Sequence, residues 1–117
     1  MDSKELGRFG EALAVKFLSK QGYKIVACNF RNALGELDII CRKQDELVFV
    51  EVKTRASTYF GEPFESVTIA KQKKLRRLAE AYIAQQHLSE NKLRFDVLSI
   101  IVRGSNEPEI NWIKYAF

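Results

Sequence analysis

The chain has 117 residues, 46% of them hydrophobic and 29% charged, which is typical of one soluble globular domain with its own core. No apolar run approaches the ~20 residues that a membrane-spanning helix needs. The amino-terminal segment mixes charges with apolar residues and lacks the apolar centre of a secretory signal. We therefore expect a single cytoplasmic domain, residues 1–117, with no membrane partner. The net charge of +4 tolerates an anionic partner without requiring one.

The first predicted element is a helix that begins after Asp2 or Ser3 and ends before Gly22. Its apolar residues recur at helical spacing, and the expected buried stripe consists of Leu6, Phe9, Gly10, Leu13, Ala14 and Phe17. A strand at 23–30 and a polar turn at 31–35 follow. Cys28 and Cys41 lie in strand-like runs without metal-binding spacing, so both are expected to be reduced core thiols.

Two further strands, 36–42 and 46–53, are close enough in sequence to form an antiparallel hairpin. After a loop at 54–66, a second helix is expected from about 67 to 87, with Leu75, Leu78, Ala79, Tyr82 and Ile83 as its apolar stripe. Strands at 93–102 and 110–117 close the chain. The order α-β-β-β-α-β-β predicts an α/β sandwich with helices packed on a central mixed sheet.

The hairpin carries polar side chains on one face and apolar side chains on the other. A turn centred between Gln44 and Asp45 places Asp38 directly opposite Glu51, with Lys53 on the same face. A register shift of two residues keeps the same face and separates the carboxylates diagonally. Two carboxylates about 4 Å apart repel by about 4 kcal/mol at an effective dielectric near 20. Lys53 and a divalent cation such as Mg²⁺ would relieve that repulsion.

The alternative interpretation of this face is a solvated surface with cross-strand ion pairs, in which Glu36 lies opposite Lys53. Ile40 and Phe49 lie on the same face and favour partial coverage by another element.

Asp38, twelve intervening residues and then Glu51-x-Lys53, on a hairpin between two helices, resembles the PD-(D/E)xK nuclease superfamily. Over nearly the whole chain, the segments "GE", "NFR", "GELDII" and "FVEVKTR" resemble the YraN-type family of small proteins, which is placed in that superfamily and compared with Holliday-junction resolvases. Leu37 stands where the superfamily has the proline of its PD pair. The resemblance implies a restriction-endonuclease-like three-layer sandwich.

The resemblance also implies roles for individual residues. Asp38 and Glu51, with the carbonyl of Val52, would hold Mg²⁺ or Mn²⁺, and Lys53 would orient or deprotonate the attacking water. Glu11 would add a carboxylate to the site. Helical periodicity alone places Glu11 off the apolar stripe, where an exposed glutamate is the default.

Basic and amide side chains supply the remaining candidates. Gln72 lies on the buried stripe of the second helix and is expected beside the site, with Lys71 near it. Arg31 and Arg55 flank the hairpin and are expected to contact phosphates. The run 71–77 holds five of the nineteen basic residues and can equally be a solvated face. On the following loop, Tyr59 and Phe60 would stack on bases or anchor the loop.

Together with these features, the resemblance implies a metal-dependent endonuclease acting on structured or branched DNA. One alternative is a non-catalytic or partner-dependent nucleic-acid-binding module with the same fold. Another is an interaction protein whose aromatic last strand, with Trp112, Tyr115 and Phe117, pairs with a second copy as a homodimer or with another chain. The single histidine and the missing GxxxxGK[ST] motif argue against histidine-based catalysis and ATP use.

Overall fold

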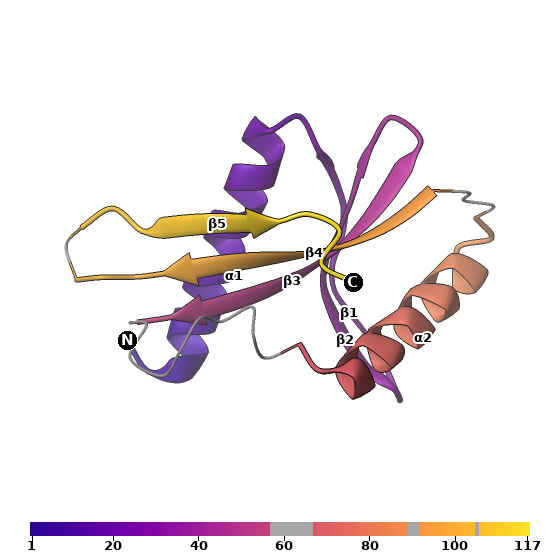
Figure 1. Cartoon of the computed structure of the whole chain (residues 1–117), viewed down its shortest axis with the longest axis horizontal. Coiled ribbons are helices and arrows are strands. Elements are labelled where there is room, and N and C mark those ends of the chain that lie inside the picture. Colours follow the sequence, from indigo (N-terminus) through magenta and orange to yellow (C-terminus); the bar gives the residue numbers. More distant parts are fainter. Residues whose placement is uncertain (57–66, 89–91, 105) are drawn as a thin grey trace.

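The computed structural model describes residues 1–56, 67–88, 92–104 and 106–117. Its elements follow the predicted order, and Figure 1 labels them: α1 (Ser3–Lys20), β1 (Lys24–Asn32), β2 (Gly35–Lys43), β3 (Glu46–Arg55), α2 (Ile69–Gln85), β4 (Lys92–Ile101) and β5 (Glu109–Ile113). None of the described helices is long and apolar enough to cross a bilayer.

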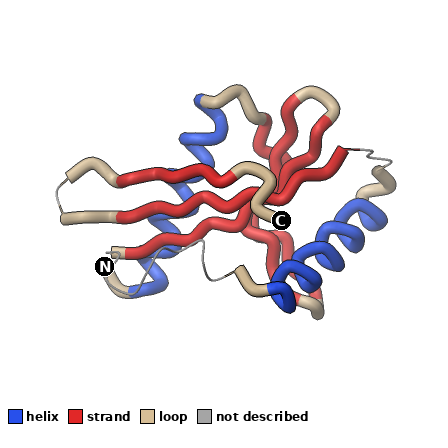
Figure 2. Tube along the Cα trace, in the orientation of Figure 1, coloured by secondary structure: helices blue, strands red, loops and turns tan. Residues whose placement is uncertain are grey.

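The strands form one mixed sheet in the order β1-β2-β3-β4-β5. Neighbouring strands are antiparallel except β3 and β4, which are parallel and are joined through α2. The two helices cover opposite faces of the sheet, which gives three layers (Figure 2). The predicted α/β sandwich is therefore confirmed.

The β2–β3 hairpin has the predicted register over its paired part. Ile39 lies opposite Val50, and Lys43 lies opposite Glu46, with Gln44 in the turn at φ 56°. The ladder stops at Ile39, one residue before Asp38 would meet Glu51. Beyond the end of this ladder, the Asp38 side chain accepts the main-chain N–H of Val52 on β3.

α1 packs against the sheet through a face that overlaps the predicted stripe and is shifted from Phe9 toward Leu18. Asp2 and Glu5 form a capping box at its start, and its buried residues are Gly10, Ala14 and Leu18. A Cβ atom at Gly10 would collide with the side chain of Thr54 on β3, so the missing side chain permits close approach of helix and strand. Of the expected stripe, Gly10 and Ala14 are buried, and Leu13 and Phe17 pack against the same cluster. Phe9 is the exception at 38% exposed, and Leu18 is buried in addition, because the close approach at Gly10 affects the rotation of the helix.

α2 buries the stripe that its periodicity predicts. Leu75, Leu78, Ala79 and Tyr82 pack in one cluster that also holds Phe49 of β3. The other buried members of this cluster are Leu37, Ile40, Leu47 and Phe95. The helix begins at Ile69, later than expected, because the hydroxyl of Thr68 caps it by accepting the N–H of Lys71.

The edges of the sheet differ from prediction in three details. β1 continues to Asn32, so the turn at 31–35 shrinks to two residues, and the side chain of Asn32 accepts the N–H of Leu34. Cys28 is exposed because it lies on this edge strand, whereas Cys41 is buried as expected, and both are free thiols. β5 ends at Ile113 instead of 117, since Tyr115 adopts φ 53° and donates its N–H to Asp96.

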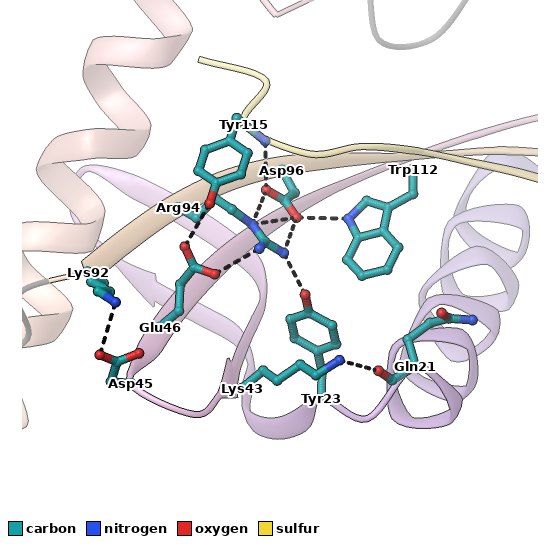
Figure 3. A network of polar contacts seen from close by, with 10 residues as sticks. All are labelled: Gln21, Tyr23, Lys43, Asp45, Glu46, Lys92, Arg94, Asp96, Trp112 and Tyr115. Atoms are coloured by element: carbon teal, nitrogen blue, oxygen red, sulfur yellow. Dashed lines mark hydrogen bonds and ion pairs between the residues drawn. The ribbon is translucent and has the colours of Figure 1, made fainter.

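A buried ionic network holds β4 to the neighbouring elements (Figure 3). The Arg94 guanidinium bonds to the fully buried carboxylate of Asp96, with Nη2 2.9 Å from Oδ2. It also donates to Glu46 at 2.8 Å and to the hydroxyl of Tyr23 at 2.9 Å, and the Trp112 indole donates to Asp96 at 2.8 Å. Because these buried charges are paired and hydrogen-bonded, we assign the network a structural role.

Candidate functional site

Three carboxylates from α1 and β2 converge at one end of the sheet. Glu11, Glu36 and Asp38 each offer an oxygen, and these oxygens all lie within 4.8 Å of one another. With its amide oriented to satisfy both ends, Asn29 donates to Glu11 at 3.2 Å and to Glu36 at 2.7 Å. The rotation of α1 turns Glu11 toward the sheet, where it is half-buried, so the default from helical periodicity alone, an exposed glutamate, does not hold.

Asp38 is the carboxylate most affected by its surroundings. Its Oδ2 accepts the main-chain N–H of Val52 at 2.8 Å, which favours the charged form. Burial and the negative charge of Glu51 outweigh that bond and raise the pKa of Asp38 to about 7. Burial also raises the pKa of Glu11, with Glu36 and Glu51 adding to the effect. The cluster therefore carries excess negative charge that a cation would neutralise.

Glu51 lies beside this cluster and is held by two ammonium groups. Its Oε1 is 2.8 Å from Nζ of Lys71 and 3.5 Å from Nζ of Lys53. Burial and the neighbouring Lys71 lower the pKa of Lys53. Burial acts in the same direction on Lys71, but its hydrogen bonds with Glu51 and Lys53 outweigh burial and raise its pKa. Of the two ammonium groups, Lys53 is therefore the one whose neutral form is favoured by its surroundings.

An open groove of about 440 Å³ gives access to these residues. Its lining combines carboxylates of the hairpin with the amino-terminal half of α2: Glu36, Asp38, Glu51, Ala70, Lys71, Lys74, Leu75 and Leu78. The Lys74 side chain passes over Gly35, where a Cβ atom would lie 2.9 Å from Cε of Lys74. The groove therefore has acidic residues on the strand side and basic residues on the helix side.

The other predicted residues lie around this groove or away from it. Gln72 donates to the carbonyl of Val67 at 3.3 Å, at the start of α2, and does not line the groove. Arg31 is 71% exposed and forms an ion pair with Glu36 at 2.8 Å. Arg55 ends β3, and its carbonyl accepts the N–H of Val102. Tyr59 and Phe60 lie outside the described residues.

The sequence did not single out Asn29 or Ser99, and it suggested a different partner for Glu36. Glu36 was expected opposite Lys53, but the structure pairs it with Arg31 and Asn29 instead. Asn29 carries a weak sequence signal, because asparagine is favoured at positive φ and has φ 55° here. Ser99 lies beside Lys53 in the β3–β4 register, and its buried hydroxyl lacks a hydrogen-bond partner within the described ranges.

The donor set fits a hard divalent cation. The available ligands are carboxylate oxygens, and the negative charge of Glu51 adds to burial in raising the pKa of Asp38, an effect that a bound cation would oppose. Mg²⁺ and Mn²⁺ prefer oxygen ligands and commonly bind through one or two carboxylates. Among the described residues, the group of possible metal ligands that lie close together consists of Glu11, Glu36 and Asp38, without a cysteine or a histidine.

The fold and this groove define a class of small α/β proteins with a carboxylate and lysine site at one end of a mixed sheet. The chain belongs to the family described as "Uncharacterised protein family UPF0102", whose model matches residues 10–100. It is 52% identical to a UPF0102 protein of Caldicellulosiruptor bescii and 44% identical to one of Clostridioides difficile, each over the whole of both chains. A UPF0102 protein of Dictyoglomus turgidum is 44% identical over 96% of this chain and 94% of its own.

Proposed function

We propose that this protein is a Mg²⁺- or Mn²⁺-dependent endonuclease that hydrolyses phosphodiester bonds in structured or branched DNA. The observation that supports it most is that Asp38 and Glu51 line one groove, with Lys53 3.5 Å from Glu51 and with Glu11 within 4.8 Å of Asp38. A PD-(D/E)xK-like role for these residues agrees with that geometry. We also propose that the protein acts in the cytoplasm and that it can assemble as a homodimer.

In this proposal Asp38 and Glu51, with the carbonyl of Val52, hold the metal, and Glu11 adds a carboxylate. The bound metal would polarise the phosphodiester and stabilise the negative charge that develops on it. Lys53 lies 3.5 Å from Glu51 and orients the attacking water, taking its proton when the amine is neutral. Its lowered pKa increases the neutral fraction near neutral pH.

The basic side of the groove supports a nucleic-acid substrate. Lys71 and Lys74 line it from α2, and Arg31 lies exposed next to Glu36 at the end of the hairpin. Lysine and arginine contacts to phosphates position a nucleic acid without reading its sequence. The preference for structured or branched DNA rests on the resemblance to Holliday-junction resolvases.

The direct test is cleavage of labelled four-way junction, flap, duplex and single-stranded DNA with Mg²⁺ or Mn²⁺. We expect cleavage of at least one branched substrate, and its loss in Glu51→Gln and Lys53→Met. Matched controls are Glu80→Gln and Lys73→Met, which change exposed residues of α2 and should retain activity. Undiminished cleavage by both site variants would contradict the proposal.

A second candidate is a nucleic-acid-binding module without catalysis. The ion pairs of Glu51 with Lys71 and Lys53 favour it, because they neutralise the carboxylate without any metal. Binding of junction DNA that is unaffected by divalent metals and unaccompanied by cleavage would support this candidate. Glu51-dependent turnover would exclude it.

A further inference from the structure

Lys71 has a position in the groove that its place on a basic helix would not suggest. Its main chain is fixed in the first turn of α2, where its N–H bonds to the hydroxyl of Thr68 at 3.2 Å. Its side chain lines the groove and reaches Glu51 on β3, with Nζ 2.8 Å from Oε1. The carboxylate of Glu51 is only 11% exposed, so this ion pair is not a solvated surface contact.

This ion pair uses an oxygen that a metal would also need. A lysine ammonium and a divalent cation compete for the same carboxylate lone pairs. The carboxylates that the described chain brings within 4.8 Å of one another are Glu11, Glu36 and Asp38, and Glu51 is not among them. In this arrangement Glu51 forms an ion pair with the ammonium group of Lys71 and is not part of the cluster of Glu11, Glu36 and Asp38.

We propose that Lys71 is a tethered counter-ion of Glu51, displaced when the metal binds, and that the displaced ammonium then binds a phosphate of the nucleic acid in the groove. The proposal rests on the metal-dependent function proposed above and adds a positioning residue to it. Lysine suits this exchange, because its flexible four-carbon stem lets a compact charge move while the backbone stays fixed. The Lys71 side chain is 33% exposed and already faces the groove, so it can reach a phosphate there.

The two neighbouring lysines have different geometry. Lys53 lies on β3, two residues from Glu51, and its ammonium is farther from Oε1, at 3.5 Å. Lys74 lines the groove one helical turn after Lys71, and none of the described ion pairs joins it to Glu51. Lys74 thus provides the same charge in the same groove without competing for the carboxylate.

If this exchange occurs, Lys71→Met should change two affinities in opposite directions: the affinity for Mn²⁺ should rise and the affinity for DNA should fall. Without DNA, we expect the variant to bind Mn²⁺ about three- to tenfold more tightly than the natural protein, because a competing cation is gone. We expect its affinity for four-way junction DNA in Ca²⁺ to fall several-fold, because a phosphate contact is lost. Electron paramagnetic resonance of free Mn²⁺ gives the first quantity, and fluorescence anisotropy of labelled junction gives the second.

Lys74→Met is the matched control, since it removes the same charge from the same groove. It should weaken DNA binding but change Mn²⁺ affinity by less than about twofold, because Coulomb repulsion from a more distant, solvated lysine is weak. Circular dichroism of each variant verifies that the fold is kept. A merely structural Lys71 would not raise Mn²⁺ affinity when removed.

Glu51→Gln separates this proposal from the function on which it rests. If Mn²⁺ binding by the natural protein depends on Glu51, but Lys71→Met leaves it unchanged or weaker, the counter-ion proposal is overturned and the metal site stands. If neither the natural protein nor Lys71→Met shows Glu51-dependent Mn²⁺ binding, both proposals are overturned.

Discussion

Asp38 accepts a hydrogen bond from the main-chain N–H of Val52, with 2.8 Å between Oδ2 and the nitrogen. The bond joins the two hairpin strands just beyond Ile39, where their ladder ends. It would by itself lower the pKa of the carboxyl, yet burial and the charge of Glu51 raise that pKa to about 7. The strand end thus holds a carboxyl whose charged form is disfavoured in the folded protein.

The first prediction concerns stability in the absence of divalent cations. Because the folded pKa of Asp38 is about 7 and its ordinary value is 3.8, the folded state binds a proton that the unfolded state has lost between these pH values. The penalty is absent below pH 3.8 and complete above pH about 7. Asp38→Asn should therefore be more stable than the natural protein at pH 8, by about 1 to 3 kcal/mol, with the difference vanishing near pH 4.

Chemical unfolding with chelator present, at intervals from pH 4 to 8, measures that difference. The control is Asp45→Asn, because Asp45 is 71% exposed and lies in the hairpin turn. Its stability relative to the natural protein should depend little on pH. A constant difference across the pH range for Asp38→Asn would contradict the assigned cause.

The second prediction concerns protons released on metal binding. A cation bound by Asp38 requires the charged carboxylate, so near pH 7 binding should expel about half a proton from this group. At pH 8.5 the group is already ionised and the release from it should be close to zero. Calorimetric titration of Mg²⁺ or Mn²⁺ in buffers with different ionisation enthalpies gives the number released. Equal release at both pH values would show that Asp38 does not titrate with the metal.

The fold was predictable where one element alone carries the signal. The period of α2 determines which of its residues, including Leu75 and Leu78, are buried. The alternation of the β2–β3 hairpin determines its register, because a shift by one residue would turn every apolar side chain to the wrong face. The period of α1 predicted the burial of Gly10 and Ala14 but not the exposure of Phe9, because the exact rotation of the helix also depends on the fit between Gly10 and Thr54, which are far apart in sequence.

The site was predictable only in part for the same reason. Asp38, Glu51 and Lys53 follow from the hairpin pattern, but their grouping with Glu11 needed the resemblance to a known family. The approach of Lys71 to Glu51 depends on how far along the sheet α2 begins, which the Thr68 cap sets. No local sequence pattern specifies where α2 begins relative to the sheet. From the sequence alone, Lys71 could therefore equally have belonged to a solvated basic face of the helix.

The third prediction concerns the buried network around Arg94. Arg94→Met should lower the free energy of unfolding by about 3 to 5 kcal/mol, because it leaves the fully buried Asp96 carboxylate without its cation. Urea denaturation followed by tryptophan fluorescence is suitable, since Trp112 contacts Asp96.

Lys92→Ala is the control for the Arg94 variant. It removes an ion pair with Asp45 whose side chains are 63% and 71% exposed, so it should cost less than about 1 kcal/mol. Equal losses for both variants would contradict a special role for the buried pair.

The fourth prediction tests the contact that sets the rotation of α1. Gly10→Ala should destabilise the protein by about 1 to 3 kcal/mol, because its Cβ would overlap the Thr54 side chain. Gly7→Ala, on the same helix, meets no atom within 4 Å and should instead stabilise by about 0.5 to 1 kcal/mol through helix propensity. Adding Thr54→Ala to Gly10→Ala should recover part of the loss, because it removes the atom of closest contact. Thermal unfolding of the four proteins gives these differences. If Gly10→Ala were as stable as Gly7→Ala, helix and strand would be free to separate, and the placement of Glu11 beside Asp38 would lose its structural cause.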